Sequence, residues 1–286
     1  GDVAADVATP DRLALVHDAW RTAEGWTVED VAILDELDSL LGPVGSDAEE
    51  DGAPDVTDRW YEDFGHVVVD EAQDLSELQW RAVVRRGPYA SWTVVGDLAQ
   101  RARRAAPASW EEVAALIGRR AVTIETLEVN YRTPSELAPL ARRALAAAGH
   151  DPDVFPRTVR PGGEAPEVVV SGDPLGPGLA AAVAALAERD GTLGVLCAAG
   201  DLAACTAVAE AAAGRRRADV RVLDPRRAKG LEFDDVVIAA PERILAASEV
   251  GAHDLYVAVT RATRLLTVVT ARPDLEVLRG DRPGSR

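Results

Sequence analysis

Short apolar runs that end in acidic turns recur along the chain, and the first of them is the clearest. The stretch from Phe64 to Val69 leads directly into Asp70-Glu71. This pattern predicts a strand that is buried on both faces of a parallel sheet. Ser91 to Asp97 predicts a second buried strand, which again ends in a turn with an acid. In open α/β sheets ligands bind at the carboxyl ends of strands, so we expect both turns to face a ligand.

The N-terminal part of the chain is acidic, and its pattern predicts helices. One is expected from Thr9 to Trp20, with Pro10 at its first helical position. Thr27 to Leu41 predicts a second, whose apolar side comprises Val31, Leu34, Leu37, Leu40 and Leu41. Gly42 to Asp55 holds almost no residue that a core would bury, which predicts a solvated loop. An acidic element that binds a partner is the alternative for this segment.

Capping patterns mark the starts of further helices. Ser76 with Gln79, and Ser109 with Glu112, form two capping boxes. A third start is predicted with Thr133 as the cap, Pro134 at the first helical position and Glu136 closing the box. The apolar stripe of that helix comprises Leu137, Leu140, Ala141, Ala144 and Leu145. Ala121 to Thr126, which precedes it, has a β-like composition.

The second half of the chain alternates predicted strands with alanine-rich helices. It begins after a proline-rich, linker-like passage from Gly149 to Pro166. Strands are expected at Glu167 to Ser171, Thr192 to Cys197, Val220 to Leu223, Asp235 to Ala239 and Leu265 to Thr270. Such alternation indicates a parallel sheet with crossover connections. We therefore expect two α/β lobes that meet near residues 125–150.

Composition sets the general class of the protein. The chain has 286 residues, of which 47% are hydrophobic, enough for one large or two ordinary domains. Its longest apolar run, Leu179 to Ala187, is too short to span a bilayer, and no signal-peptide pattern opens the sequence. We therefore expect a soluble, cytoplasmic protein with no membrane partner. Cys197 and Cys205 are the only cysteines, and we expect two buried thiols.

The charge of the chain limits how it can meet nucleic acid. The formal net charge is −17, which argues against a protein that binds nucleic acid over its whole surface. Any such contact must be local. Nearly every cation is arginine, and Lys229 is the only lysine.

The adjacent acids after the first strand suit one chemistry in particular. One carboxylate can bind Mg²⁺, directly or through water, while its neighbour orients or deprotonates a water that attacks a phosphoryl group. Taken alone, Asp70-Glu71 is weak evidence for this chemistry, because it fits an ordinary acidic turn between a strand and a helix better than a catalytic pair.

Five short segments, taken together in chain order, resolve this ambiguity. They are Asp70-Glu71-Ala72-Gln73-Asp74, Gly96-Asp97-Leu98-Ala99-Gln100, Asn130-Tyr131-Arg132-Thr133-Pro134, Ala228-Lys229-Gly230-Leu231-Glu232-Phe233-Asp234 and Tyr256-Val257-Ala258-Val259-Thr260-Arg261-Ala262. Their order and residues resemble motifs II to VI of superfamily-1 helicases of the UvrD/Rep type. The resemblance spans residues 64 to about 270. It implies an α/β fold of RecA-like, P-loop NTPase-type parallel sheets with helices on both faces.

The resemblance also implies roles for individual residues, with ATP and Mg²⁺ as the cofactors. Asp70 and Glu71 would lie at the metal, Asp70 as its ligand and Glu71 as the base that activates water. Gln100 would contact the γ-phosphate. The residues implied at the nucleotide from the later motifs are Tyr131 on the base, Arg132 on the γ-phosphate, Gly230 and Glu232 at the ribose side, and Arg261 as a second arginine finger. Planar guanidinium groups suit a phosphoryl transition state, whose charge is spread over several oxygens.

The departures from the family pattern are equally informative. A phosphate-binding loop needs glycines and a lysine before Ser or Thr, but Lys229 is followed by Gly230. The chain thus has no Walker A motif, and we expect an incomplete first lobe, residues 1–126 (1A), and a second lobe, residues 127–286 (2A), with the missing segment upstream. The interval from Arg132 to Lys229 is too short for the large accessory insertion of UvrD proteins, and Arg226 lies near the place of the usual motif V histidine.

The segment after Gln100 indicates which branch of the superfamily the chain resembles. Arg101-Ala102-Arg103-Arg104 offers no aromatic face on which a base of single-stranded DNA would stack. With the other departures, this is similar to the HelD-type branch of helicase-like ATPases, which bind bacterial RNA polymerase and release it from nucleic acid. RNA polymerase is therefore the expected partner. A DNA-translocating UvrD-like repair helicase and a non-enzymatic protein-binding module are the alternatives.

Overall fold

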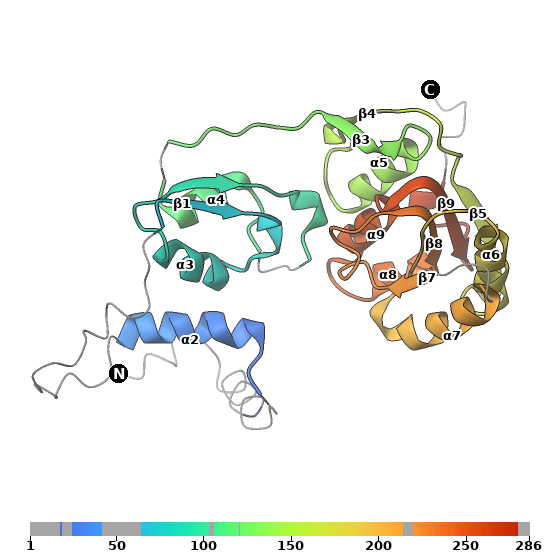
Figure 1. Cartoon of the computed structure of the whole chain (residues 1–286), viewed down its shortest axis with the longest axis horizontal. Coiled ribbons are helices and arrows are strands. Elements are labelled where there is room, and N and C mark those ends of the chain that lie inside the picture. The colour runs from blue at the N-terminus through green and yellow to red at the C-terminus, as the bar shows by residue number, and fades with distance from the viewer. Residues whose placement is uncertain are drawn as a thin grey trace, which may run out of the picture. The chain divides into compact units, whose positions relative to one another are not determined.

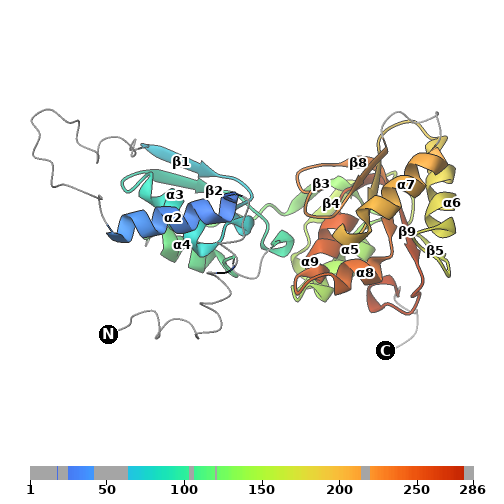
Figure 2. The same cartoon turned by 90° about the horizontal axis from the view of Figure 1, so that it is seen from below.

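The computed structural model describes residues 18, 25–41, 64–102, 106–119, 121–213 and 220–279. These residues form two compact units (Figures 1 and 2). The first comprises residues 1–68, 75–93 and 116–118, and the second comprises 69–74, 94–115 and 119–286. Apart from Asp18, the helix expected from Thr9 to Trp20 lies outside the described residues, as does the loop expected from Gly42 to Asp55.

Strands β1 (His66–Val69) and β2 (Ser91–Val94) form a two-stranded sheet. Ser91 N donates to Gly65 O at 3.1 Å and Val95 N donates to Val69 O at 2.8 Å. Both strands therefore advance in the same direction, which makes the pair parallel. The prediction that both strands are buried on both faces is wrong for the described residues. Val69 is buried while Val68 is 65% exposed, because alternate side chains of this small sheet point away from its covered face.

Helix α3 (Glu77–Arg85) follows β1 and begins with the expected capping box of Ser76 and Gln79. Helix α2 (Val28–Leu41) packs against α3 through ion pairs: Arg85 contacts Asp35 and Glu36. The predicted apolar side of α2 is exposed within the described part of the chain, from 39% at Leu34 to 76% at Leu41. The helix is thus where the sequence predicts it, but Ala32 and not the predicted apolar side is buried, and the contacts of Arg85 with the helix are ion pairs.

The second unit contains a five-stranded sheet in the order β5-β9-β8-β6-β7. Its strands are β5 (Glu167–Val170), β6 (Leu193–Leu196), β7 (Val220–Leu223), β8 (Phe233–Ala239) and β9 (Ala262–Thr270). All four pairings between neighbours are parallel. The expected strands of the second half are therefore confirmed, and the fold class is α/β with parallel strands.

Helices cover both faces of this sheet (Figures 1 and 2). Alternate residues of β8 separate the two cores: Val236 and Ile238 pack with helices α5 (Ala138–Ala147) and α9 (Gly251–Val259). Val237 and Ala239 pack with α6 (Pro177–Ala187) and α7 (Leu202–Ala213) on the other face. Cys197 and Cys205 lie in this second core as buried free thiols, as predicted. No helix among the described residues is long and apolar enough to cross a membrane.

Three local predictions for residues 121–166 are wrong. Residues 121–126 form no strand, and all are exposed. Thr133 and Pro134 belong to strand β3 (Val129–Pro134), and α5 begins later, after Leu137. The passage from Gly149 to Pro166 is more than a linker, because it contains β4 (Arg157–Arg160), which pairs with β3 in parallel. The apolar stripe predicted for α5, by contrast, is buried throughout: Leu137, Leu140, Ala141, Ala144 and Leu145.

The remaining short elements complete the chain. Helix α4 spans Trp110–Ile117, and at its start Glu112 N donates to Ser109 Oγ at 3.2 Å. Helix α8 spans Pro241–Ala246. Single 3-10 turns occur at η3 (Ala72–Asp74), η4 (Leu98–Gln100), η5 (Pro152–Val154), η6 (Ala199–Asp201) and η7 (Glu276–Leu278).

Candidate functional site

The turn after β1 holds Asp70 and Glu71 in a constrained geometry. Glu71 has φ of 51°, a left-handed conformation that is uncommon for residues other than glycine. Its backbone N donates to Asp70 Oδ1 at 2.8 Å, and its Oε2 accepts from Gln73 Nε2 at 2.6 Å. The adjacent carboxylates are therefore oriented separately, one by backbone and one by a side-chain amide.

Gln73 ties this turn to the one that follows β2. Its side chain is fully buried, and its Oε1 accepts from the backbone N of Asp97 at 3.0 Å. The neighbouring Gly96 is required by space, because a Cβ there would lie 2.5 Å from Gln73 Oε1 and 3.2 Å from Ala72 N. Two predicted motifs thus meet through one buried amide and one close backbone approach.

Gln100 is held by both ends of its amide. Asp97 caps η4 by accepting from Ala99 N at 2.9 Å, and its other oxygen accepts from Gln100 Nε2 at 2.8 Å. Gln100 Oε1 in turn accepts from Arg261 Nη2 at 3.1 Å. Within the second unit, the structure therefore brings the predicted motif III glutamine into direct contact with the predicted motif VI arginine.

Arg261 is almost fully buried, with only 2% of its surface exposed. Its Nε donates to Val257 O at 3.1 Å, its Nη1 to Leu231 O at 3.2 Å, and its Nη2 to Thr260 Oγ1 at 3.1 Å as well as to Gln100. A guanidinium has five N–H donors, so one remains without a partner among the described residues. Burial lowers the pKa of Arg261, with a further lowering from Arg132, whereas the carboxylate of Glu71 acts in the opposite direction.

Tyr131, Arg132 and Glu232 lie on an exposed part of the second unit. Tyr131 is 75% exposed, and Arg132 Nε forms an ion pair with Glu232 Oε2 at 3.0 Å. Gly230 occupies the turn before Glu232 with φ of 72°, where a side chain would be strained. The two residues that the resemblance assigns to opposite ends of a nucleotide, Arg132 and Glu232, thus contact each other in this structure.

Sequence reasoning missed a contact between motif II and motif V. Lys229 Nζ lies 2.6 and 2.7 Å from the two carboxylate oxygens of Asp74, which also accepts from Ala102 N at 3.0 Å. The lysine side chain is only 9% exposed. Asp74 is the last residue of the motif that begins at Asp70, and Lys229 is the only lysine of the chain. These two features of the sequence could have drawn attention to Asp74 and Lys229.

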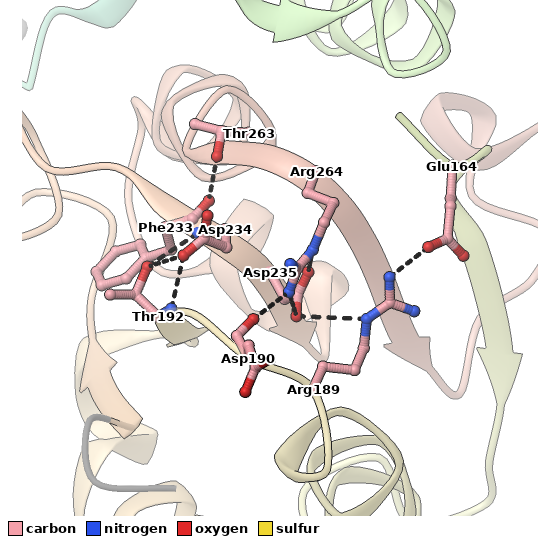
Figure 3. A network of polar contacts seen from close by, with 9 residues as sticks. All are labelled: Glu164, Arg189, Asp190, Thr192, Phe233, Asp234, Asp235, Thr263 and Arg264. Carbon is pink, nitrogen blue, oxygen red and sulfur yellow. Dashed lines mark hydrogen bonds and ion pairs between the residues drawn. The ribbon is translucent and has the colours of Figure 1, made fainter. Parts of the chain in front are cut away.

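A buried polar network, also missed, fixes the start of β8 against the start of β9 (Figure 3). Asp235 is fully buried and accepts from Arg264 Nε at 2.9 Å and Arg264 Nη2 at 2.6 Å. Arg189, which is paired with Glu164, approaches the same carboxylate at 3.8 Å. Asp234 accepts from Thr192 N at 2.7 Å and Thr192 Oγ1 at 3.0 Å. Since Phe233 N also donates to Arg261 O, this network positions the starts of the two strands that Glu232 and Arg261 directly precede.

The donor set at Asp70 and Glu71 fits Mg²⁺, although no cluster of three or more His, Cys, Asp or Glu occurs among the described residues. Mg²⁺ commonly binds through one or two carboxylates together with water and substrate phosphates. Asp70 is exposed, and its hydrogen bond within the described part of the chain is the one from the backbone N of Glu71. One face of the carboxylate is therefore open for a hydrated ion.

The part of the second unit from β7 through β9 matches a known protein family. Residues 219–269 match the UvrD-like helicase C-terminal domain. The matched stretch contains Lys229, Glu232 and Arg261. It covers less than half of the chain, and no curated protein matches the chain.

Solved helicase structures give weaker likenesses. The C-terminal domain of a possible DNA helicase from Lactobacillus plantarum WCFS1 is 22% identical, with 49% of this chain and 87% of that chain covered and a TM-score of 0.37. An arterivirus nonstructural protein 10 (helicase) in complex with DNA is 16% identical, with 75% and 41% covered and a TM-score of 0.42. The PRRSV helicase is 14% identical, with 88% and 48% covered and a TM-score of 0.43. At these scores the likenesses carry no argument about function.

Proposed function

We propose that this chain is part of the ATPase core of a cytoplasmic, superfamily-1 helicase-like motor that hydrolyses ATP with Mg²⁺. In this proposal residues 1–126 belong to a first RecA-like lobe and residues 127–286 form the second. The observation that carries the proposal is the hydrogen bond from Arg261 to Gln100, whose amide is held by Asp97. A buried arginine that meets a glutamine beside two exposed acids is an arrangement suited to phosphoryl transfer.

Each acid has a separate task in the proposed reaction. Asp70 binds Mg²⁺, which would neutralise charge that develops on the phosphate oxygens. Glu71 orients and deprotonates the attacking water, and its hydrogen bond from Gln73 fixes the carboxylate for that task. The left-handed backbone at Glu71 supports the assignment, because strained residues cluster at functional sites.

The arginines have to change partners before they act on ATP. Arg261 has one free N–H in this structure, so a planar, two-donor contact with a phosphate requires it to release Gln100 or Thr260. Arg132 likewise has to separate from Glu232 if one is to reach the γ-phosphate and the other the ribose, with Tyr131 on the base and Gly230 beside it. Both exchanges would couple nucleotide binding to rearrangement of the site.

The working partner proposed is RNA polymerase, as in the HelD-type ATPases. The net charge of −17 supports it, since an acidic protein is suited to compete with nucleic acid for a basic channel. The exposed extended residues 121–128 and the described part of the segment after Gln100 show no aromatic platform for single-stranded DNA. A DNA-translocating repair helicase is the second candidate, and a non-enzymatic protein-binding module is the third.

One experiment separates the three candidates. ATP hydrolysis is measured on a longer protein that contains this chain together with an upstream Gly-x-x-x-x-Gly-Lys-Ser/Thr loop, with added core RNA polymerase or added single-stranded DNA. Stimulation by polymerase alone supports the proposal, and stimulation by DNA alone supports the repair helicase. Absence of hydrolysis under both conditions would contradict an ATPase and leave the binding module.

A further inference from the structure

A second polar cluster lies at the opposite end of α9 from Arg261. His253 and Asp254 are in the first turn of this helix, and each is 6% exposed. Arg101, which follows η4, and Lys229 act electrostatically on His253. Eight residues separate His253 from Arg261, about 12 Å at the rise of an α-helix, so the cluster is distinct from the proposed ATPase site.

The cluster contains buried polar atoms that have no partner. Both ring nitrogens of His253, Arg101 Nε and Asp254 Oδ1 lack a hydrogen bond in the described part of the chain. The remaining such atoms there are the indole nitrogens of Trp80 and Trp92, which lie elsewhere. Buried polar groups are almost always hydrogen-bonded, so several unpartnered atoms on these three residues point to a ligand that binds them.

The chemistry of the unpartnered atoms indicates which kind of ligand could form hydrogen bonds with them. Arg101 Nε–H and an N–H of the His253 ring are donors, so they need acceptor oxygens. Burial lowers the pKa of His253 to about 4, and the positive charges of Arg101 and Lys229 act in the same direction. His150, whose ring meets that of His253 edge-on at 5.5 Å, lowers it further. An anion bound among these groups would relieve the repulsion.

Asp254 limits which anions can bind, because its carboxylate needs a hydrogen-bond donor. Its Oδ2 is engaged by Arg226 Nε at 3.5 Å and by Ser248 Oγ at 3.4 Å, but its Oδ1 has no donor within the described residues. A carboxylate beside a fully ionised anion would be repelled, whereas a ligand that keeps a proton can donate it to Oδ1. Hydrogen phosphate and a terminal phosphomonoester have such a proton near neutral pH. Sulfate and the diester backbone of a nucleic acid have none.

We propose that Arg101, His253 and Asp254 form a binding site for a hydrogen phosphate or phosphomonoester group, with Lys229 contributing positive charge. Two phosphate oxygens accept from Arg101 Nε and the His253 ring, and the P–OH group donates to Asp254 Oδ1. Entry requires the Arg101 side chain to move, because the Nε atom is covered although the residue is partly exposed.

The histidine rings themselves provide the test. Ring resonances of His253 are titrated by NMR in the full chain, without phosphate and then with inorganic phosphate, sulfate or chloride at equal ionic strength. We expect phosphate to raise the pKa of His253 by at least one unit in a saturable way, because the imidazolium gains an anionic partner. Sulfate should have less than one fifth of the effect. His66, which is exposed and hydrogen-bonded to Ser91 and Thr93, is the internal reference, and its ring resonances should not differ among the three salts.

Two substitutions and a titration with a phosphorylated nucleotide test the roles of the individual residues and the source of the phosphate. Arg101→Gln should abolish the phosphate effect, and Asp254→Asn should make sulfate and phosphate equivalent, both in protein that shows a cooperative thermal transition. A 5′-phosphorylated nucleotide that reproduces the shift identifies a phosphomonoester end as the source, and inorganic phosphate alone identifies the free ion. An unchanged pKa of His253 in phosphate would overturn the site and leave only buried water there. Equal effects of sulfate and phosphate on the wild type would overturn the role of Asp254.

Discussion

Replacing Arg261 by lysine tests how much of the second unit depends on one buried guanidinium. In the wild type the side chain links Val257, Leu231, Thr260 and Gln100 through four hydrogen bonds. A lysine ammonium is a single point with three donors and cannot reach acceptors on opposite sides of a planar group. At least two of the buried acceptors would lose their donor, each at about 1–2 kcal/mol. We expect Arg261→Lys to lower the free energy of unfolding by about 3 kcal/mol and Arg261→Ala by more.

The measurement is urea denaturation of the 286-residue chain, followed by far-UV circular dichroism. Arg272→Lys is the matched control, because Arg272 pairs with Asp274 on the exposed surface and should show no measurable change. Gln100→Ala removes the acceptor for Arg261 and the donor to Asp97, so it should cost about 1–2 kcal/mol, and the double variant with Arg261→Lys should be less than additive. An Arg261→Lys protein as stable as the wild type would refute the reasoning that this guanidinium holds the motifs together.

The same structure predicts three other outcomes. The pKa of His253 is about 4 in the folded chain against 6.5 for the free side chain, so the unfolded state binds the proton first and the free energy of unfolding falls as pH drops below 6.5. The loss should reach about 2 kcal/mol at pH 5 in phosphate-free buffer, and it should disappear in His253→Gln. Lys229→Met leaves Asp74 without its cation and should destabilise by about 2 kcal/mol in urea, a loss that Asp74→Asn in the same chain should partly restore; no loss in Lys229→Met would contradict the pair. Because this chain has no phosphate-binding loop, calorimetry should show ATP affinity on the order of millimolar or weaker, and micromolar binding would contradict that inference.

The parallel sheet of the second unit was predictable because its strands are short, nearly continuous apolar runs with polar ends. Residues 121–126 have a similar composition, but composition cannot say whether a partner strand is present, and none pairs with them among the described residues. The helix start at Thr133 was mispredicted because Asn130 competes for the same role. Its Oδ1 accepts from Arg132 N and Thr133 N at 2.9 Å each, and the chain stays in strand β3 through Pro134 before it turns into α5.

The sequence predicted individual residues of the candidate site but not all of the contacts between them. The motifs named Gln100 and Arg261, and the structure shows them in contact, but no local pattern could pair Asp74 with Lys229 across 155 residues. The same holds for Asp235 and Arg264, whose buried pair looks in sequence like two ordinary charged residues at strand ends. Roles at a nucleotide remain predictions for every residue of the site.

The turnover of a Glu71→Gln variant tests the central claim most directly. Glutamine keeps the size of the side chain and can still meet Gln73, but it cannot take a proton from water. In the longer protein with a phosphate-binding loop, kcat for ATP should fall by about 10³-fold or more, with ATP affinity and melting temperature close to those of the wild type. Glu77→Gln, which alters an exposed acid on α3 in the same way, is the matched control and should leave kcat unchanged. A Glu71→Gln enzyme with wild-type turnover would contradict the account.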